Sequence, residues 1–423
     1  MPTSTGTCSR RGLRLHRLFG SALLLGSILA ACGTSSAAAL KSPGSANASV
    51  KSQSPYYIHA ILSITGAGSI LGSREAKALN VLAAQVNNNG GIQGHPLKFE
   101  IEDNRTSPTV AVSLATPIIS SGTPLLFVGS IVAPDQAVDA LTGPSGPFIY
   151  DFSPIENPKP GSMVFAAGTP LLMDAEAYLT FLKSKAYDNL SIITSTDATG
   201  VGGYQALREA LKLPQFSSMH LVAHQTFNPS AVSANTQLSI IKAANPQALI
   251  IWTTGSPLGT VLNGMSELAM DGIPTVTDNG NASQALLKNF QSVLPKHTYF
   301  PTPPFYLPPA EISNREVRAK VTSFDNAITS IGGHPGNPYA LAWDPAQLVL
   351  NALQKLGVGA TPGQIQNYMQ NLHNVPGVFG LYNTSRLHHH GLSTSDIYMT
   401  TWNGTSFVQA SGPGGTAISI PQG

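Results

Sequence analysis

Two runs of alternating strand-like and helix-like segments constrain the fold of this chain more than any other feature. The strand-like segments are short and rich in β-branched or aromatic residues, as in Tyr56 to Ile64 (YYIHAILSI), which is typical of a buried parallel strand. The helix-like segments repeat apolar residues on one face, as Ala76, Leu79, Leu82 and Val86 do. Such an alternation predicts an α/β fold in which helices cover parallel sheets.

The first run spans about residues 56–152 and predicts one doubly wound lobe. The expected strands are residues 56–64, 97–102, 125–128 and 148–152. A glycine loop, Gly66 to Gly72, follows the first strand, and Ser73 is a candidate cap for the helix after it. A second helix is expected at residues 109–120.

The second run predicts another α/β lobe of similar size. Its expected strands are residues 190–194, 219–224, 248–253 and 274–277, and its expected helices are residues 175–185, 203–211, 232–243 and 258–270. A proline-laden segment, residues 299–309, then predicts an extended crossover between the lobes, because proline blocks helix and limits strand pairing. Helices at 316–331 and 340–356 and a strand at 397–402 with a hairpin at Asn403-Gly404 complete the expected elements.

The N-terminal segment has the features of an export signal. Four arginines between residues 10 and 17 precede an apolar run from Leu18 to Ala31, which is too short to span a bilayer as a permanent helix. The run ends in Leu29-Ala30-Ala31-Cys32, which resembles a bacterial lipoprotein signal, where the cysteine is acylated and becomes the new N-terminus. We expect a signal peptide over residues 1–31, lipidation at Cys32 and a flexible tether over residues 32–54, so that the protein is extracytoplasmic and touches the cell membrane only through its lipid.

Charge and cysteine content exclude several classes of protein. The signal holds four of the 23 basic residues and none of the 21 acidic ones, so the remaining chain carries 19 against 21 and has no nucleic-acid footprint. The two cysteines are Cys8, inside the signal, and Cys32. The folded part therefore has no disulfide, no cysteine chemistry and no thiolate metal site.

Two glycine-rich segments lie between a strand and a helix, where a dinucleotide fingerprint would lie. Gly66 to Gly72 is followed one strand later by Glu102 and Asp103, where a ribose-binding acid would stand, and Gly200 to Gly203 is a similar loop. Tight turns in an α/β lobe explain both segments without a nucleotide, and the glycine spacing is not that of the usual fingerprint. An exported nicotinamide-dependent enzyme is thus a second hypothesis, although no catalytic motif supports it.

A run of three histidines, His388 to His390, is the one segment that suggests a metal. Three consecutive imidazoles do not converge easily on one ion, because neighbouring side chains point in different directions. We therefore expect neither a metal site nor a cofactor.

A resemblance to a known family rests on segments between about Tyr56 and Val408. The block Asn87 to Gly94 (NNNGGIQG), then Asp103, Pro108 and Gly129, follows the order found in the leucine/isoleucine/valine-binding protein family. These are type I solute-binding proteins of ABC transporters. Three later segments are similar to the rest of the family pattern: Ala342 to Ala346 (AWDPA), Gly377 to Gly380 (GVFG) and Trp402 to Gly404 (WNG).

The resemblance implies two α/β lobes joined by a hinge of three crossings. Lobe 1 would comprise residues 55–168 and 302–378, and lobe 2 residues 169–301 and 379–412. The protein would be a monomer that captures a small polar or amphipathic, amino-acid-like molecule and delivers it to an ABC permease, and not an enzyme. A sensor or receptor ectodomain of the same fold is the alternative.

The family binds its ligand between the lobes, at the carboxyl ends of the strands. Carried over position by position, the resemblance implies ligand-binding roles for seven residues: Leu71, Ser130, Ala133, Ser153, Glu156, Thr199 and Asp278.

Departures from the family pattern bear on specificity. Asp278 falls where the family has the acid that binds the ligand's amine, but Ala133 lacks an expected hydroxyl group. Leu71 and Thr199 replace common aromatic residues. Glu156 stands near an expected threonine, where it would repel a carboxylate, and a one-residue gap would put Asn157 there instead. If Glu156 faces the cleft with Asp278, the two acids favour a cationic ligand. If it points to solvent, only Asp278 does.

Overall fold

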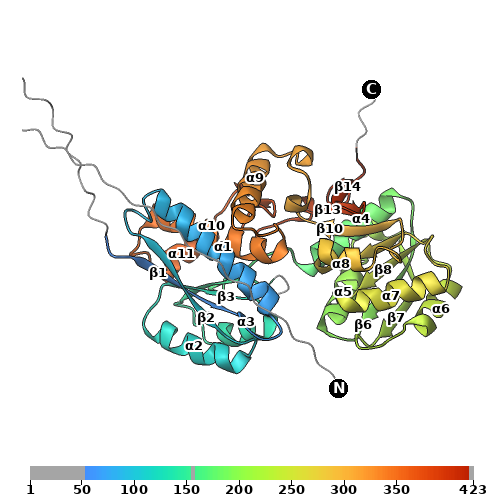
Figure 1. Ribbon diagram of the computed structural model, residues 1–423, viewed down its shortest axis with the longest axis horizontal. Helices are drawn as coiled ribbons and strands as arrows, with labels where there is room; N and C mark the ends of the chain where they lie inside the picture. The colour runs from blue at the N-terminus through green and yellow to red at the C-terminus, as the bar shows by residue number, and fades with distance from the viewer. Residues whose placement is uncertain (1–52, 154–157, 419–423) are drawn as a thin grey trace, which may run out of the picture. The chain divides into compact units, whose positions relative to one another are not determined.

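The computed structural model describes residues 53–153 and 158–418 of the chain. Two sheets with helices on both faces are its main features (Figure 1). They confirm the α/β fold with two doubly wound, parallel-sheet lobes. The expected signal peptide and Cys32 lie outside the described residues, as do nearly all of the tether and Glu156.

The first lobe is built on a five-stranded parallel sheet with the order β2-β1-β3-β4-β5. Its strands are β1 (Tyr56–Leu62), β2 (Leu97–Asp103), β3 (Leu125–Val128), β4 (Phe148–Asp151) and β5 (Val164–Ala166). The chain turns to one side of β1 for β2 and to the other for β3. At such a switch point the loops after the strands separate and leave room for a ligand.

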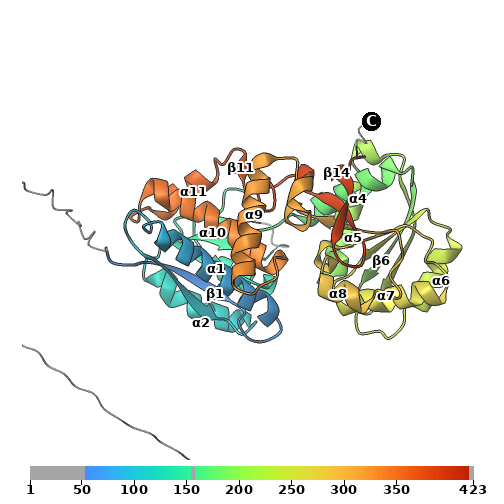
Figure 2. The same cartoon turned by 45° about the horizontal axis from the view of Figure 1, so that its top comes forward.

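Helices cover both faces of the first sheet (Figure 2). Successive strand residues point to opposite faces, so Leu62 packs with α1 (Ser69–Asn88) and α10 (Asn337–Leu356), whereas Ile61 packs with α2 (Pro108–Ser120) and α3 (Val132–Asp139). Two further helices, α9 (Arg315–Ser330) and α11 (Pro362–Met369), join the larger of the two clusters.

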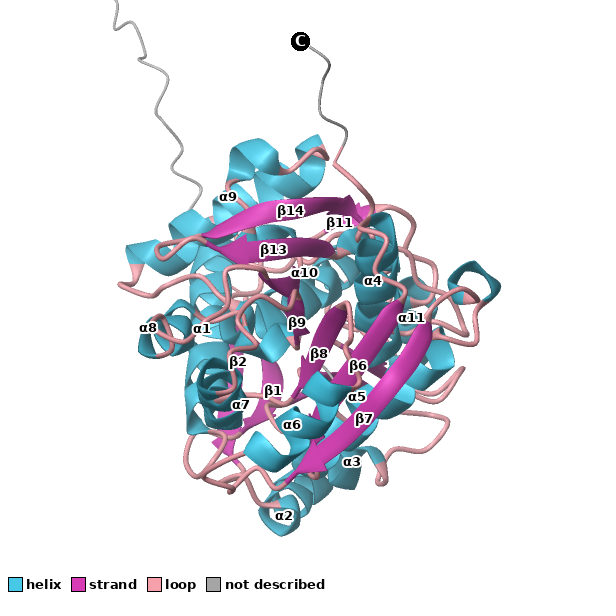
Figure 3. Ribbon diagram, turned by 90° about the vertical axis from the view of Figure 1, so that its right-hand side faces the viewer, coloured by secondary structure: helices cyan, strands magenta, loops and turns pink. Residues whose placement is uncertain are grey.

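The second lobe is built on a seven-stranded sheet with the order β14-β13-β10-β9-β8-β6-β7 (Figure 3). Its strands are β6 (Asn189–Ser195), β7 (His220–Phe227), β8 (Ala248–Trp252), β9 (Thr275–Thr277), β10 (Thr298–Thr302), β13 (Tyr398–Trp402) and β14 (Phe407–Pro413). Strands β6 to β10 are parallel, and β13 and β14 add an antiparallel hairpin at one edge, at the expected turn.

The second sheet is also covered on both faces. Helices α4 (Leu171–Ser184) and α5 (Ala198–Ala210) pack on one face, and α6 (Asn235–Ala243) and α7 (Ser256–Glu267) pack on the other. Short elements without a strong apolar period escape the sequence analysis: α3, α11, β5 and α8 (Gln284–Asn289).

Two local expectations are wrong. Ser73 does not cap the first helix, because α1 begins at Ser69 with Gly68 at the N-cap position and no capping side chain. Residues 298–302 are not a free crossover but strand β10, inside the second sheet. Pro301 is tolerated there because β9 pairs only with Thr298 and Tyr299, so the proline lies beyond that ladder.

The chain passes between the two sheets three times: after β5, after β10, and between β12 (Leu381–Tyr382) and β13. Before the last passage, Tyr382 and Leu392 pack in the first lobe's core.

Asp344 explains why this segment stays with the first lobe. Its buried carboxylate accepts hydrogen bonds from the backbone N–H groups of Val378, at 2.8 and 2.9 Å, and Phe379, at 3.0 Å, and from the hydroxyl of Tyr382, at 3.0 Å. Two of the family-like segments, AWDPA and GVFG, are therefore joined by one carboxylate.

No helix among the described residues is long and apolar enough to cross a membrane.

Candidate functional site

Loops at the carboxyl ends of β1, β2 and β3 are fastened to one another by two polar side chains. The carboxylate of Asp103 accepts hydrogen bonds from the N–H groups of Ile64 and Thr65, at 3.0 and 3.1 Å, and from the hydroxyl of Thr65, at 2.7 Å. The amide of Asn104 accepts from Ser63 Oγ at 2.8 Å and donates to the carbonyl of Gly129 at 3.2 Å. The first lobe thus presents a pre-organised loop cluster at this edge.

Ser130 is held beneath that loop cluster. Its side chain is buried, its hydroxyl donates to the carboxyl group of Glu75, and its oxygen accepts from the N–H of Ser63 at 3.3 Å. Glu75 is fully buried on α1, and burial raises the pKa of this carboxyl group to about 8, against a smaller lowering by the Ser130 hydrogen bond. The hydroxyl of Ser130 is therefore already engaged within the lobe.

The other first-lobe candidates end up near the same edge. Leu71 lies in the first turn of α1, and Ala133 is exposed in the first turn of α3. Ser153 follows β4 and is buried, and its Oγ has no hydrogen-bond partner among the described residues.

Close packing explains the glycines between Gly66 and Gly72. A Cβ at Gly72 would lie 2.3 Å from the carbonyl oxygen of Ser63, and one at Gly68 would lie 2.8 Å from Ile131. Gly66 has φ +83°, a conformation that L side chains rarely adopt. These glycines let α1 approach β1 closely, which accounts for them without a dinucleotide.

The second-lobe loops are organised around Asp278, which follows β9 directly. The side chain is only 6% exposed, and Oδ1 accepts a hydrogen bond from the N–H of Gly280 at 2.6 Å. The pKa of Asp278 is raised to about 6, mainly by burial and to a smaller extent by the charge of Asp197, against a lowering by hydrogen bonds from Gly280 and Thr254.

A second buried acid, Asp174 on α4, lies close enough to Asp278 for their charges to interact. It accepts hydrogen bonds from Thr169 Oγ1 at 3.3 Å and Asn279 Nδ2 at 2.9 Å. Burial and then the charge of Asp278 raise the pKa of Asp174 well above its usual range. The sequence analysis missed both Asp174 and Glu75. The spacing of each helix indicates that these acids are buried, because each lies four residues before an apolar or aromatic residue on the buried face: Asp174 before Tyr178, and Glu75 before Leu79.

Thr199 lies in the first turn of α5, beside the N-cap residue Asp197. The carboxylate of Asp197 accepts from Ser195 Oγ at 2.7 Å and from the N–H of Gly200 at 3.1 Å. A Cβ at Gly200 would lie 1.9 Å from the carbonyl oxygen of Ser195. Packing of α5 against strands β6 and β8 therefore also accounts for Gly200 and Gly203.

The two buried acids of the second lobe, Asp174 and Asp278, have no basic partner among the described residues. Across residues 53–153 and 158–418, the ion pairs join His59 to Glu100 and Glu102, and Lys212 to Glu209. Asp278 is thus a buried carboxyl group at the carboxyl end of a parallel strand. Its pKa of about 6 lets it ionise near neutral pH, and no basic group among the described residues neutralises the charge. Such a group is suited to a cationic ligand.

A cavity of about 450 Å³ lies elsewhere on the second lobe, between α5 and the edge strand β7. The stacked rings of Tyr204 and His224, 3.7 Å apart, line it with Arg208. Two strands, β8 and β6, separate β9 from β7 in the sheet, so this cavity does not include Asp278.

Two of the three consecutive histidines bind backbone carbonyl groups. His389 Nδ1 lies 2.6 Å from the carbonyl oxygen of Val164, and its ring stacks on Phe165 at 4.2 Å. His390 Nδ1 lies 3.2 Å from the carbonyl oxygen of Gly168. Their role is to hold residues 389–390 against the segment around β5.

Comparison with known proteins agrees with the two-lobed α/β fold. A family model described as a periplasmic binding protein matches residues 55–407. No curated relative matches the chain in sequence.

Solved structures share the fold at low sequence identity. An extracellular ligand-binding receptor from Rhodopseudomonas palustris HaA2 is 16% identical with a TM-score of 0.71, over 85% of this chain and 100% of that one. The branched-chain amino acid transporter substrate-binding protein LivJ from Streptococcus pneumoniae, in complex with isoleucine, is 18% identical with a TM-score of 0.67, over 84% and 99%. The leucine-binding protein LivK from Thermotoga maritima is 17% identical with a TM-score of 0.66, over 84% and 97%.

The fold and the loops at its strand ends define a two-lobed binding protein. The chain belongs to the periplasmic binding protein family, type I. This confirms the expected family. Because the family and its structural neighbours bind solutes or ligands, the protein is a binding protein and not an enzyme.

Proposed function

We propose that this protein is a lipid-anchored, extracytoplasmic solute-binding protein that captures an amino-acid-like molecule with a cationic group and delivers it to an ABC permease. The ligand would bind between the lobes, where the loops after the strands of both sheets carry the candidate residues. Family membership supports an extracytoplasmic location and a small ligand.

The observation that carries the proposal is the buried carboxyl group of Asp278. It is 6% exposed, follows β9 directly, and has no basic partner among the described residues. A ligand amine would supply the missing positive charge and form a charge-assisted hydrogen bond. Thr199, in the first turn of α5, would border the same ligand.

The first lobe would bind the rest of the ligand. Because Ser130 already donates to Glu75, the donors left for a ligand carboxylate are Ser153 Oγ and the backbone N–H of Ala133. Amides in the first turn of a helix have no intrahelical acceptor, so Ala133 serves despite its missing hydroxyl. Leu71 and Glu156 complete the proposed set, with Glu156 acting only if it faces the ligand.

The ligand is best identified by mass spectrometry of molecules that remain bound through purification, followed by a thermal-shift panel of amino acids, amines and polyamines. Calorimetry then compares the wild type with Asp278→Asn and with Asp271→Asn, an exposed acid just before β9 that serves as the control. Asp278→Asn should weaken a cationic ligand by ~1.5–3 kcal/mol, the size of a charge-assisted hydrogen bond, and Asp271→Asn should not. Unchanged affinity in Asp278→Asn would contradict the proposal that Asp278 binds an amine of the ligand. Glu156→Gln tests the second acid in the same assay.

Capture between lobes requires that the ligand stabilise a closed state through contacts to both lobes. Saturating ligand should then raise the melting temperature and reduce the radius of gyration in solution scattering. An unchanged scattering curve with a ligand that binds would contradict the hinge mechanism.

A sensor or receptor ectodomain is the second candidate. Structural neighbours from Rhodopseudomonas palustris are described as extracellular ligand-binding receptors. Permease genes beside this gene, and loss of ligand uptake when the gene is deleted, support delivery. An intact uptake rate with a lost transcriptional response to the ligand supports the receptor.

A further inference from the structure

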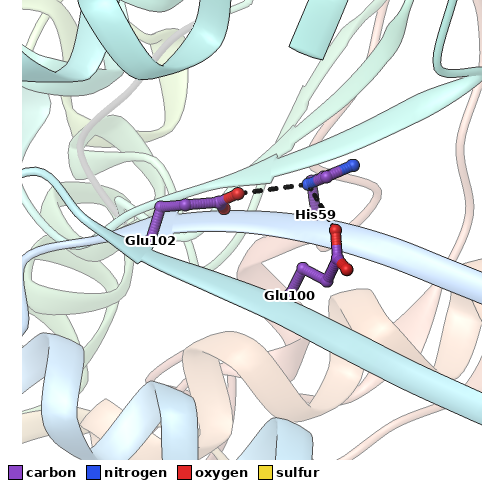
Figure 4. A group of neighbouring side chains, drawn as sticks. All are labelled: His59, Glu100 and Glu102. Atoms are coloured by element: carbon purple, nitrogen blue, oxygen red, sulfur yellow. Dashed lines mark hydrogen bonds and ion pairs between the residues drawn. The ribbon is translucent and has the colours of Figure 1, made fainter. Parts of the chain in front are cut away.

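A histidine and two glutamates converge on the first sheet, on strands β1 and β2 (Figure 4). His59 on β1 stands opposite Glu100 on β2 in the parallel register. Glu102 lies two residues further along β2, so its side chain emerges on the same face as that of Glu100. We call these three residues the His59 cluster.

The spacing within the cluster fits a shared metal ion as well as it fits the one hydrogen bond, between His59 Nδ1 and Glu102 Oε1. His59 Nδ1 lies 3.2 Å from Glu102 Oε1 and 3.4 Å from Glu100 Oε2. One ring nitrogen carries one hydrogen and serves two acceptors poorly, and N–H···O distances centre on about 2.9–3.0 Å. Around a tetrahedral Zn²⁺ with bonds of about 2.1 Å, neighbouring ligand atoms stand about 3.4 Å apart.

Burial and charge point the same way. His59 and Glu102 are half-buried, with side chains 22% and 27% exposed, and the second carboxylate oxygen of Glu102 is buried without a hydrogen-bond partner among the described residues. Two carboxylates facing one imidazole leave an excess of negative charge that a divalent cation would neutralise.

Nearby basic groups do not supply that charge. Lys98 lies two residues before Glu100 on β2, but its ammonium group stands over the ring of Tyr57, 5.8 Å from the centroid. The ion pairs of the described residues give the two glutamates no cationic partner besides His59.

We propose that the His59 cluster is a binding site for a divalent transition-metal cation of the Zn²⁺ class, with His59 Nδ1 and one oxygen each of Glu100 and Glu102 as ligands. Imidazole with two carboxylates is a donor set that zinc accepts, and the partial exposure of Glu100 leaves the remaining coordination position to water. The sequence gives no sign of this site, because His59 stands 41 and 43 positions before the two glutamates and meets them only through the strand register.

The site would stabilise the edge of the first lobe. Strand β2 is the outermost strand of its sheet and is paired to β1 alone, so a metal bridging the two strands would restrain it. Asp278 belongs to the second lobe, so the proposal is independent of solute capture, and its test uses the metal alone.

The test is titration of the metal-stripped protein with ZnCl₂ by calorimetry at pH 7, with thermal denaturation in parallel. We expect one Zn²⁺ per chain with micromolar affinity and a melting temperature that rises with zinc. His59→Gln, Glu100→Gln and Glu102→Gln should each weaken zinc binding tenfold or more. The controls His220→Gln and Glu311→Gln, at exposed positions outside the cluster, should bind as the wild type does.

A spectroscopic readout separates ligation from a change in stability. Co²⁺ should give visible ligand-field absorption in the wild type that is lost or altered in Glu100→Gln, whose half-exposed side chain makes misfolding the least expected. The proposal is overturned if the wild type binds no stoichiometric zinc. It is also overturned if either His59→Gln or Glu100→Gln, folded by circular dichroism, keeps an affinity within tenfold of the wild type.

Discussion

The hydroxyl group of Ser130 donates a hydrogen bond to the buried carboxyl group of Glu75. Ser130 stands in the loop after β3 and Glu75 on α1, so the bond fastens a loop of the candidate site to the helix beneath it. The other oxygen of Glu75 has no partner among the described residues, and burial raises the pKa of the group to about 8. At neutral pH the site loop is therefore supported by a carboxyl group that is largely protonated.

This pKa predicts that the ligand-free protein loses stability as the pH rises. The folded state holds the Glu75 proton up to about pH 8, whereas the unfolded chain releases it near pH 4.5. The unfolded state therefore binds fewer protons between these values, and the free energy of unfolding falls across this window. Glu75→Gln keeps a hydrogen-bonding side chain without the ionisation, so it should be more stable than the wild type by roughly 3 kcal/mol at pH 7.

Urea denaturation at pH 5, 7 and 8.5 measures the difference. The gain of Glu75→Gln should grow from pH 5 to pH 8.5, and the exposed control Glu311→Gln should show no such trend. A gain that stays constant with pH would mean that Glu75 is not the titrating group.

Gly203 and Gly202 are neighbours on α5 that should respond oppositely to alanine. A Cβ at Gly203 would lie 2.2 Å from the ring of Trp252, which is buried on β8, whereas one at Gly202 would lie 3.1 Å from a terminal methyl group of Leu171. Alanine gains about 1 kcal/mol of helix propensity at either site, but overpacking costs ~1–3 kcal/mol or more at Gly203. Gly203→Ala should therefore destabilise and shift Trp252 fluorescence, and Gly202→Ala should not. Equal stability of the two variants would place the helix further from the sheet than described.

The sequence predicts the fold well where one physical signal dominates. Buried parallel strands such as β3 and β8 are continuous apolar runs, and their ends are found to within one residue. The signal fails where tertiary context decides. Proline at 301 argues against a strand, yet β10 forms because the ladder on one side has already ended.

For the candidate site, too, the sequence predicts single residues but not the contacts between residues that are distant in the chain. The family resemblance predicts a ligand-binding role for Asp278, and the structure puts this residue at the carboxyl end of β9, in a loop of the second lobe. Its charge interacts with those of Asp197 and Asp174, which are about 80 and 100 residues away in sequence and near only in the fold: Asp197 raises the pKa of Asp278, and Asp278 raises that of Asp174. The His59 cluster was likewise invisible, since nothing local in the sequence specifies that His59 pairs with Glu100.

Cys32→Ser tests the proposed anchor. Serine lacks the thiol that is acylated, so the variant should be released from membranes or remain unprocessed, whereas the wild type should partition into detergent with the membrane fraction. Fractionation with Triton X-114 and mass spectrometry of the N-terminus measure both outcomes, with Cys8→Ser as the control inside the expected signal. A mature, detergent-partitioning Cys32→Ser protein would contradict lipidation at this residue.

Ligand affinity should depend on pH through Asp278. Its pKa of about 6 in the ligand-free protein means that the carboxylate needed by a cationic group is mostly formed at pH 7 and mostly protonated at pH 5. Affinity for a cationic ligand should therefore fall about tenfold between pH 7 and pH 5, because protonation of the free site competes with binding. Calorimetry at pH 5, 6, 7 and 8 measures this dependence, with a ligand whose own amine stays protonated throughout. In Asp278→Asn the affinity should be lower and nearly independent of pH, while Asp271→Asn, exposed on the same lobe, should follow the wild type.

A wild-type affinity that is flat from pH 5 to pH 8 would mean that the ligand does not use the ionised form of Asp278. The recognition of a cation at β9 would then have to be abandoned, while family membership would stand.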